Sequence, residues 1–433
     1  MLQNVIAGLQ GIIDHAMVGH FVGFTGNAAI GVSWQVLLVV IVFISSLFTG
    51  MAVLVSRFVG ANEPDKVNRV VYQSFLTAAG LAVVMAAVGY AVAPGLLRLI
   101  NASPEVQVEA LPFLRVMFLG GLGIMMFFML SGAFRAAGDS RTPLKLGAGL
   151  TVLTVVFNVI LIPLFGTVGA AYGTVASNLV VSVYGVWKLF SPDSVIHLHA
   201  GIDKKPDFTV IRSLFKFGLP TGIQGIAMNV GGVLMLRFIG SLEHSAAAQA
   251  AYAVGYTELF SLITWTSNGL MGAAATIAGQ NLGAGQSDRA ARGVAVAARI
   301  GFGAALVVGA FFVFVPDLLL GIFSMHDPFA AQLGGELLKY LSVSGLFITV
   351  ALSYTGGLQG TGDTRSPLYI SVVSQVIIPI GLCSFLQATR GLHPQDIWLA
   401  IVLGHSTRAV LSVIRFRQGR WRSIRVDIEP ARS

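Results

Sequence analysis

The stretch SGAFRAAGDSRTPL, residues 131–144, recurs as TGGLQGTGDTRSPL at residues 355–368, with six of its fourteen positions identical. Two shorter strings repeat at nearly the same distance along the chain. RFVGANEPDK at 57–66 matches QNLGAGQSDR at 280–289, and GHFVG at 19–23 matches LRFIG at 236–240. The three offsets are 224, 223 and 217 residues. We therefore interpret the chain as two homologous halves in tandem.

The composition is that of an integral membrane protein. Of the 433 residues, 55% are hydrophobic and 11% are charged, whereas soluble domains carry about 25% charged residues. Apolar runs recur that are long enough to cross about 30 Å of hydrocarbon as helices. These runs are continuously apolar, which excludes the alternating strands of a membrane β-barrel. We expect an all-α fold with about twelve transmembrane helices at 1–20, 33–57, 71–97, 111–134, 146–165, 168–190, 212–240, 246–279, 293–316, 333–357, 368–388 and 396–416.

Positive charges lie mostly on one side of the predicted membrane. Of the 27 Lys and Arg residues, 22 fall in the even-numbered connections and the C-terminal segment, including seven arginines from Arg408 to Arg432. The positive-inside rule places this side in the cytoplasm. Six helices in each half make the two repeats parallel and pseudo-symmetric. We expect one lobe at 1–190, a cytoplasmic linker at 191–209, a second lobe at 210–416 and a basic cytoplasmic tail at 417–433.

Seven strings along the chain form a recognisable series. They are DHAMVGH at 14–20, GA at 60–61, GDSRTP at 138–143, VGAAYGT at 168–174, GQNLGAG at 279–285, GDTRSP at 362–367 and RFRQGRW at 415–421. In this order and spacing they resemble the strings of multidrug and toxic compound extrusion (MATE) transporters over nearly the whole chain. The resemblance implies a V-shaped pair of lobes around a central cavity. It also implies a monomer in the cytoplasmic membrane, in contact with membrane lipids.

The activity that this resemblance implies is secondary antiport. Small amphipathic organic cations would be expelled in exchange for H⁺ or Na⁺, and no cofactor other than the coupling ion is expected. Related MATE proteins often carry an aspartate four residues after the asparagine of the fifth helix. Here Asn158 is followed at that spacing by Ile162. With one carboxylate fewer, the sequence favours H⁺ over Na⁺.

Asp14 is the first candidate for the coupling site, because a carboxylate inside a predicted membrane helix is expensive to keep there without a function. Desolvation favours its protonated form, so it can alternate between binding a cation and binding a proton. Asn158 and Thr174 supply neutral oxygens on the fifth and sixth predicted helices. In the family, residues at these positions help to bind Na⁺ or to tune the aspartate. The alternative for all three is hydrogen bonding between helices, which stabilises membrane proteins only modestly.

Glu258, inside the eighth predicted helix, is the candidate for a second protonation site, with a buried hydrogen-bonded pair as the alternative. Aromatic side chains on the same helix can bind organic cations through their ring faces, although their helical spacing equally suits packing. The candidates for the substrate cavity are Tyr252, Tyr256, Trp265, Gln35, Gln224 and Asn229.

Other features indicate structural roles or exclude other classes of protein. In the two Gly-Asp strings, glycine ends one helix and Asp139 or Asp363 caps the next. We expect the C-terminal arginines to contact anionic lipids and not nucleic acid. The lone Cys383 has no disulfide partner, and the chain carries no Walker A string and no zinc spacing, so we expect no enzyme.

A flippase for lipid-linked saccharides is the alternative function, and it would need several buried Lys and Arg residues.

Overall fold

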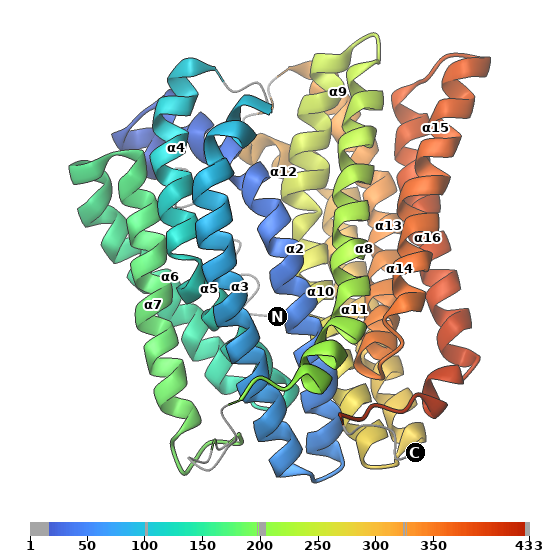
Figure 1. Ribbon diagram of the computed structural model, residues 1–433. Coiled ribbons are helices and arrows are strands. Elements are labelled where there is room, and N and C mark those ends of the chain that lie inside the picture. Colours follow the sequence, from blue (N-terminus) through green and yellow to red (C-terminus); the bar gives the residue numbers. More distant parts are fainter. Residues whose placement is uncertain are drawn as a thin grey trace. The chain divides into compact units, whose positions relative to one another are not determined.

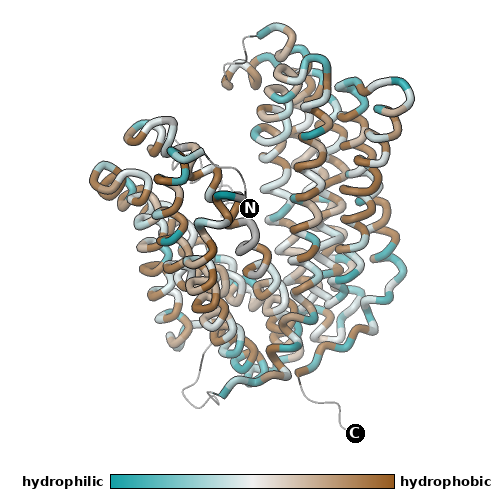
Figure 2. The backbone as a smooth tube through the Cα atoms, turned by 45° about the horizontal axis from the view of Figure 1, so that its top comes forward, coloured by the Kyte–Doolittle hydropathy of each residue, from teal (hydrophilic) through white to brown (hydrophobic). Residues whose placement is uncertain are grey.

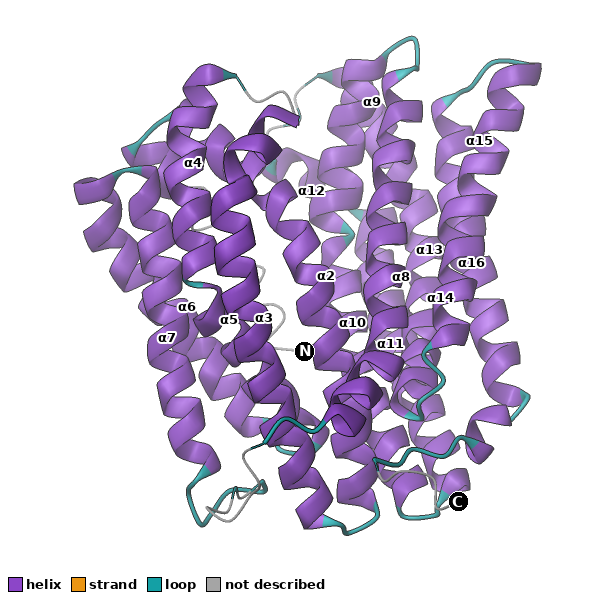
Figure 3. Cartoon of the chain, in the orientation of Figure 1, coloured by secondary structure: helices purple, strands orange, loops and turns teal. Residues whose placement is uncertain are grey.

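The structure is a computed structural model that describes residues 17–99, 103–196, 198, 205–323, 325 and 327–428. These residues form helices joined by short loops, and none of them lies in a strand (Figures 1 and 3). The first half holds α2 (Phe24–Gly60), α3 (Pro64–Leu99), α4 (Pro104–Leu119), α5 (Gly121–Ala136), α6 (Arg141–Phe165) and α7 (Thr167–Leu189). The second half holds α8 (Phe208–Gly240), α9 (Ser245–Tyr252), η1 (Ala253–Leu259), α10 (Ser261–Gly283), α11 (Ser287–Phe314), α12 (Pro316–Ile322), α13 (Pro328–Gly360), α14 (Arg365–Val372), η2 (Val373–Ile377), α15 (Ile378–Thr389) and α16 (Pro394–Arg417), followed by η3 (Arg420–Ser423).

The helices have the length and hydropathy that a bilayer requires. Among the described residues, seven helices are long and apolar enough to span a membrane, and the bent pair of α4 and α5 adds an eighth. Hydrophobic residues run along the helices, and many of the hydrophilic ones lie near the connections (Figure 2). The expected all-α membrane fold is confirmed, and each predicted run after the first contains one or more of the helices named above, although not every one of these helices meets the criteria for spanning.

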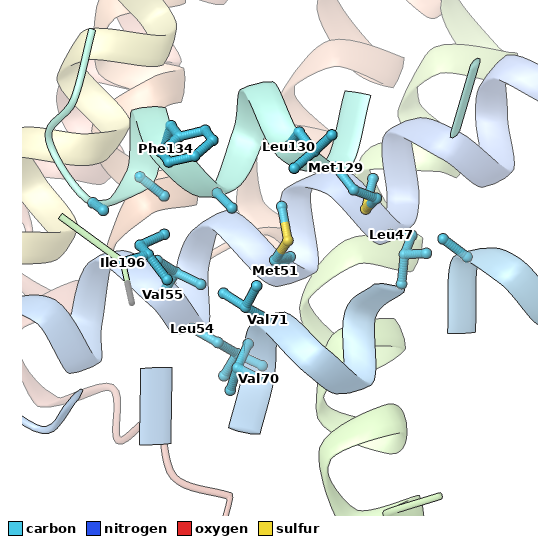
Figure 4. Packing of buried hydrophobic residues seen from close by; sticks show 14 of the residues in the cluster. Leu47, Met51, Leu54, Val55, Val70, Val71, Met129, Leu130, Phe134 and Ile196 are labelled. Atoms are coloured by element: carbon cyan, nitrogen blue, oxygen red, sulfur yellow. The ribbon is translucent and has the colours of Figure 1, made fainter. Parts of the chain in front are cut away.

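The chain divides into two compact units. The N-terminal unit comprises Leu2–Gly222 together with Val426–Ser433, and the C-terminal unit comprises Ile223–Arg425. The division therefore falls inside α8. Each unit has its own apolar core. In the N-terminal unit, α2, α3 and α5 pack through a buried cluster that includes Met51, Leu54, Val70 and Phe134 (Figure 4).

The repeated Gly-Asp strings adopt the same local structure in both halves. Gly138 and Gly362 each have a φ of 96°, a left-handed conformation that glycine adopts at little cost. Asp139 Oδ1 accepts hydrogen bonds from the backbone N–H groups two and three residues later, at 2.9 and 3.0 Å. Asp363 Oδ1 accepts from the N–H three residues later, at 3.2 Å. The prediction that glycine ends one helix and aspartate caps the next is confirmed.

Three predicted runs are interrupted by breaks that the hydropathy pattern does not reveal. The run at 111–134 bends by 52° where α4 meets α5 at Gly120. The run at 246–279 contains the π-helix η1, and the run at 368–388 contains the π-helix η2. A π-helical turn accommodates an extra residue and often lies at a functional site. Expecting each of these runs to be one regular α-helix was wrong.

The end of α16 and part of the basic tail pack on protein, while Arg417, Arg420 and Arg425 are exposed, so that contact of the arginines with lipid stays a prediction. Arg415 pairs with Asp363 at 2.8 Å, and Arg422 pairs with Asp288 at 2.9 Å. Trp421 is buried in the C-terminal unit. Ile428, beyond the end of that unit, is fully buried in the apolar cluster of the N-terminal unit.

The segment that leads into α8 is held by a polar contact with α3. Arg69 donates to the carboxylate of Asp207, and Gln73 donates to the backbone oxygen of Lys205 at 2.7 Å. Burial of Asp207 opposes its ionisation. The hydrogen bonds from Arg69 and from the backbone N–H groups at 209 and 210 outweigh this effect and hold the pKa of the carboxyl below its usual range.

We predict that Asp207→Asn loosens this segment. A lowered pKa means that the contribution of Asp207 to stability is complete above the usual aspartate pKa of about 3.9 and is lost as the pH falls through the lower folded value. Because Arg69 is 44% exposed, the loss at neutral pH should be at most about 1 kcal/mol, or about fivefold in local opening. Hydrogen exchange of a peptide that covers residues 205–210 measures it. Asp193→Asn, a change to an exposed carboxylate in the same connection, should leave the exchange unchanged; an equal effect of both variants would contradict the prediction.

Candidate functional site

The polar centre of the N-terminal unit is formed where α6 meets α7. Asn158 on α6 is 0% exposed. Its Oδ1 lies against the backbone of Gly173 on α7, so close that a Cβ at Gly173 would be 2.0 Å from it. This contact with Gly173 is one of close packing. Gly173 therefore allows Asn158 to lie against α7.

Thr174 is the next residue along α7 and is half-buried. Its backbone oxygen accepts a hydrogen bond from Asn178 Nδ2 at 2.8 Å. The Ser177 hydroxyl donates to the backbone oxygen of Gly173 at 2.7 Å. The structure thus places Asn158 against the backbone turn that precedes Thr174. Asp14, the third member of this predicted site, lies outside the described residues.

The position where MATE relatives often have an aspartate is apolar and enclosed. Ile162, one helical turn after Asn158, is 1% exposed. It belongs to a hydrophobic cluster with Ala170 and Ala171 of α7 and with Val18. Val18 is among the first described residues and follows Asp14 by four positions. The described part of this centre therefore offers neutral oxygen and amide groups, and Ile162 adds no charge.

Glu258 lies in η1, and its side chain is exposed at the protein surface. The expected alternative, a buried hydrogen-bonded pair, does not describe this side chain. A charged group in the middle of a membrane segment is unfavourable in contact with lipid chains. Glu258 therefore requires water or another polar group at its position.

Tyr252 and Tyr256 lie against one another, with their ring centroids 4.8 Å apart and their planes inclined by 11°. Tyr252 is buried and Tyr256 is half-buried. Tyr252 also stacks on Trp398 of α16 at 6.4 Å. Trp265 is half-buried on α10. The two tyrosines are thus part of the core of the C-terminal unit, and Tyr256 keeps some exposure.

Gln224 takes part in a buried polar network within the C-terminal unit. It donates to Ser371 Oγ at 2.7 Å and accepts from Gln359 Nε2 at 3.3 Å. Asn229 is exposed on the same helix and donates to the backbone oxygen of Gly225 at 2.9 Å. Gln35 lies in α2, and its side chain is not among those described. Gln224 therefore bonds to residues of α13 and α14, which the sequence did not single out.

The sequence analysis missed two buried polar residues of α16. Arg408 was assigned to the cytoplasmic group of arginines, but it lies inside α16 and is 4% exposed. That assignment was wrong because a count by loops ignores the helix register. His405, three residues earlier, is 3% exposed and bonds to Ser344. The signal was present in the sequence, because both residues fall inside the predicted run at 396–416.

An apolar cavity, also not predicted, lies in the N-terminal unit near the bend between α4 and α5. It is small, with a volume of about 30 Å³, and it is partly open to the surface. Methionine side chains are flexible and polarisable, and they adapt to apolar ligands of different shape. The cavity is lined by Leu37, Ile44, Ala82, Met85, Met117, Phe118, Gly121, Ile124 and Met125.

Comparisons with known proteins agree on one family. Residues 1–160 and 220–384 match the MatE family model. The probable multidrug resistance protein NorM of Thermotoga maritima is 24% identical over 433 residues, covering 97% of this chain and 90% of that protein. The probable multidrug resistance protein YpnP of Bacillus subtilis is 25% identical over 436 residues, covering 99% and 95%.

The fold agrees with solved structures over the same length. The outward-facing conformation of a multidrug resistance MATE family transporter matches with a TM-score of 0.90 at 20% identity, covering 98% of this chain and 95% of that one. A MATE structure in complex with MaL6 matches with a TM-score of 0.88 at 21% identity, covering 98% and 95%. The architecture is therefore the one found in MATE transporter structures.

We predict that Gly173→Ala destabilises the protein by about 1–3 kcal/mol, the usual effect of overpacking. The new methyl group would meet Asn158 Oδ1, and the enclosed amide has little room to move. Melting temperatures of the purified protein in detergent measure the effect. Gly149→Ala on α6 is the matched control, because a Cβ there meets nothing within 4 Å. Adding Asn158→Ala to Gly173→Ala should recover part of the loss. If it recovers nothing, the amide does not lie against α7 as described.

Proposed function

We propose that this chain, which belongs to the MATE family of multidrug transporters, is a secondary antiporter that takes up protons and expels amphipathic organic cations. Asp14 is the proposed coupling residue. When ionised it attracts a cationic substrate, and when protonated it releases that substrate. One carboxylate cannot hold both positive species at once, and this exclusion is what couples the two movements.

The described residues that we expect near Asp14 support a proton as the coupling ion. The enclosed side chain of Ile162 stands where a second carboxylate would favour Na⁺. Asn158 and Thr174 remain as neutral oxygen donors, which suit a proton-accepting aspartate better than a tightly held cation. The apolar enclosure of Ile162 is the observation that carries this choice.

Glu258 is a proposed second protonation site in the C-terminal unit. Its exposed carboxylate is available to water or to a cation. We propose that Trp265, which keeps partial exposure, offers a ring face to an organic cation. Further candidates for the substrate cavity are Tyr252, Tyr256, Gln35, Gln224 and Asn229. The driving force includes about 2.3 kcal/mol for each charge moved through 100 mV. A monomer in the cytoplasmic membrane with a cytoplasmic C-terminus remains our expectation.

The alternative function, a flippase for lipid-linked saccharides, requires several cationic side chains around a pyrophosphate. Arg408 adds one buried guanidinium to those expected from the sequence. Its interactions within the described residues are with Tyr256 and His405. We therefore retain the antiporter.

We predict that Asp14→Asn reduces substrate efflux at least tenfold, because the amide cannot exchange a proton for a cation. Efflux of a fluorescent organic cation such as ethidium from proteoliposomes with an imposed pH gradient measures this. Asp14→Glu should retain part of the activity, since it keeps the carboxylate. Asp65→Asn, a change to an exposed carboxylate at the start of α3, should transport like the unchanged protein.

The same vesicles distinguish the coupling ions. Replacing Na⁺ by K⁺ on both sides should leave efflux intact, and collapsing the pH gradient should stop it. Full efflux by Asp14→Asn would remove Asp14 from the mechanism. Efflux that follows a sodium gradient instead would overturn proton coupling.

A further inference from the structure

The five residues that follow η3, which we call the crossing segment, are extended and alternate between apolar and charged side chains. They read Ile-Arg-Val-Asp-Ile and have no helical structure. Successive side chains of an extended chain point to opposite sides. Arg425 and Asp427 are exposed. Ile424 and Val426 are half-buried, and Ile428 is buried. The apolar side of the crossing segment therefore lies on protein.

The apolar residues of the crossing segment pack in different units. Ile424 packs against a core cluster of the C-terminal unit. Val426 packs against a core cluster of the N-terminal unit, and Ile428 is a fully buried member of that cluster. Arg425 is the residue that separates the two attachments. The chain therefore changes from one unit to the other within two positions.

The C-terminal unit holds its end of the crossing segment through Trp421. The indole Nε1 donates to the backbone oxygen of Phe416 at 2.8 Å, and the two rings stack with their centroids 4.8 Å apart. Gly419, between them, has a φ of 71° and turns the chain back toward Phe416. A turn, a ring stack and a hydrogen bond together anchor this end.

The attachment to the N-terminal unit has a different character. Asp427 forms an ion pair with Lys66 at 3.5 Å, and these side chains are 55% and 23% exposed. Lys66 also pairs with Glu63. Exposed ion pairs contribute little to stability, and the Ile428 N–H donates to the carboxylate of the preceding residue. We therefore regard the burial of the Ile428 side chain as the main attachment.

We propose that the crossing segment is a releasable latch, which leaves the N-terminal unit and returns to it during each transport cycle. This inference rests on the proposed antiport. A carrier that exposes one site to each side of the membrane in turn needs its two repeats to move relative to each other. The chain joins the two units after Gly222, inside α8, and again after Arg425. The first connection is a continuous helix, whereas the second is an extended chain with one buried anchor. The second is therefore the connection that can detach.

Ile428→Cys tests the release without a transport measurement. The full-length protein in detergent is treated with a maleimide, and mass spectrometry follows each cysteine. Cys383, fully buried in the core of the C-terminal unit, is the internal reference for a side chain that stays buried. Ser423→Cys, at an exposed position of η3, is the reference for a free side chain. We expect Ile428→Cys to react at least tenfold faster than Cys383 and at least tenfold slower than Ser423→Cys. A rate equal to either reference would overturn the latch, because the segment would then be permanently attached or not attached.

Lys66→Cys combined with Asp427→Cys tests whether transport requires the release, and it keeps Ile428. A short methanethiosulfonate cross-linker joins the two cysteines and fixes the crossing segment on the N-terminal unit, and a reductant removes it. We expect cross-linking to reduce the efflux of an organic cation from proteoliposomes at least tenfold, and reduction to restore it. The matched control is Asp288→Cys with Arg422→Cys, which replaces an ion pair of 2.9 Å inside the C-terminal unit and should transport equally with and without the cross-linker.

The two experiments distinguish a failure of the latch from a failure of the antiport. Unchanged efflux after cross-linking of the first pair would overturn the latch, since transport would then proceed with the segment fixed. Absence of proton-driven efflux in the unchanged protein would contradict the antiport, and the maleimide rates would still decide whether the segment detaches.

Discussion

The structure depends on helices that approach one another until backbone touches backbone. Within the N-terminal unit, a Cβ at Gly218 would lie 1.8 Å from the backbone oxygen of Ser46. Within the C-terminal unit, a Cβ at Gly356 would lie 2.1 Å from the backbone oxygen of Met271. Lipid chains are as apolar as leucine, so helices in a bilayer gain little from burying apolar side chains against one another. Close approach restores dispersion contacts, and glycine permits it.

The same constraint explains where polar groups can lie. Asn158 has room because α7 presents Gly173 to it, and the side chain is fully enclosed. The buried Ser177 directs its hydroxyl to the backbone oxygen of Gly173. The hydrogen bond from Ser177 satisfies polar atoms that lipid cannot. The chemistry of the site is therefore inseparable from the packing that positions it.

The sequence predicted those parts of the fold that are properties of one segment. Long apolar runs predict spanning helices because hydropathy is local, and the paired Gly-Asp strings predict their turns because glycine and aspartate act on adjacent backbone. The π-helices were not predictable, because η1 is accommodated by a ring stack with Trp398 and His405, which lie far along the chain.

Arg408 was misassigned for a related reason. Counting charges by loops treats a buried arginine near a helix end like one in a connection, and only the packing of α16 distinguishes the two. For Asn158 the helix was predictable from the sequence, but the contact with Gly173 was not.

The two halves share a framework but carry different charges on it. In the last helix of the first half, Gly173 packs on Asn158 of the preceding helix, and in the last helix of the second half, Gly404 packs on the backbone oxygen of Ser374 in η2. Thr174 and His405 directly follow these glycines, and Ser177 and Arg408 follow them by four residues. The last helix of the first half thus carries a small hydroxyl group four residues after its packing glycine, and the last helix of the second half carries a guanidinium there. Because a repeat preserves backbone contacts and not side-chain chemistry, the first half can hold a neutral polar centre while the second holds a positive one.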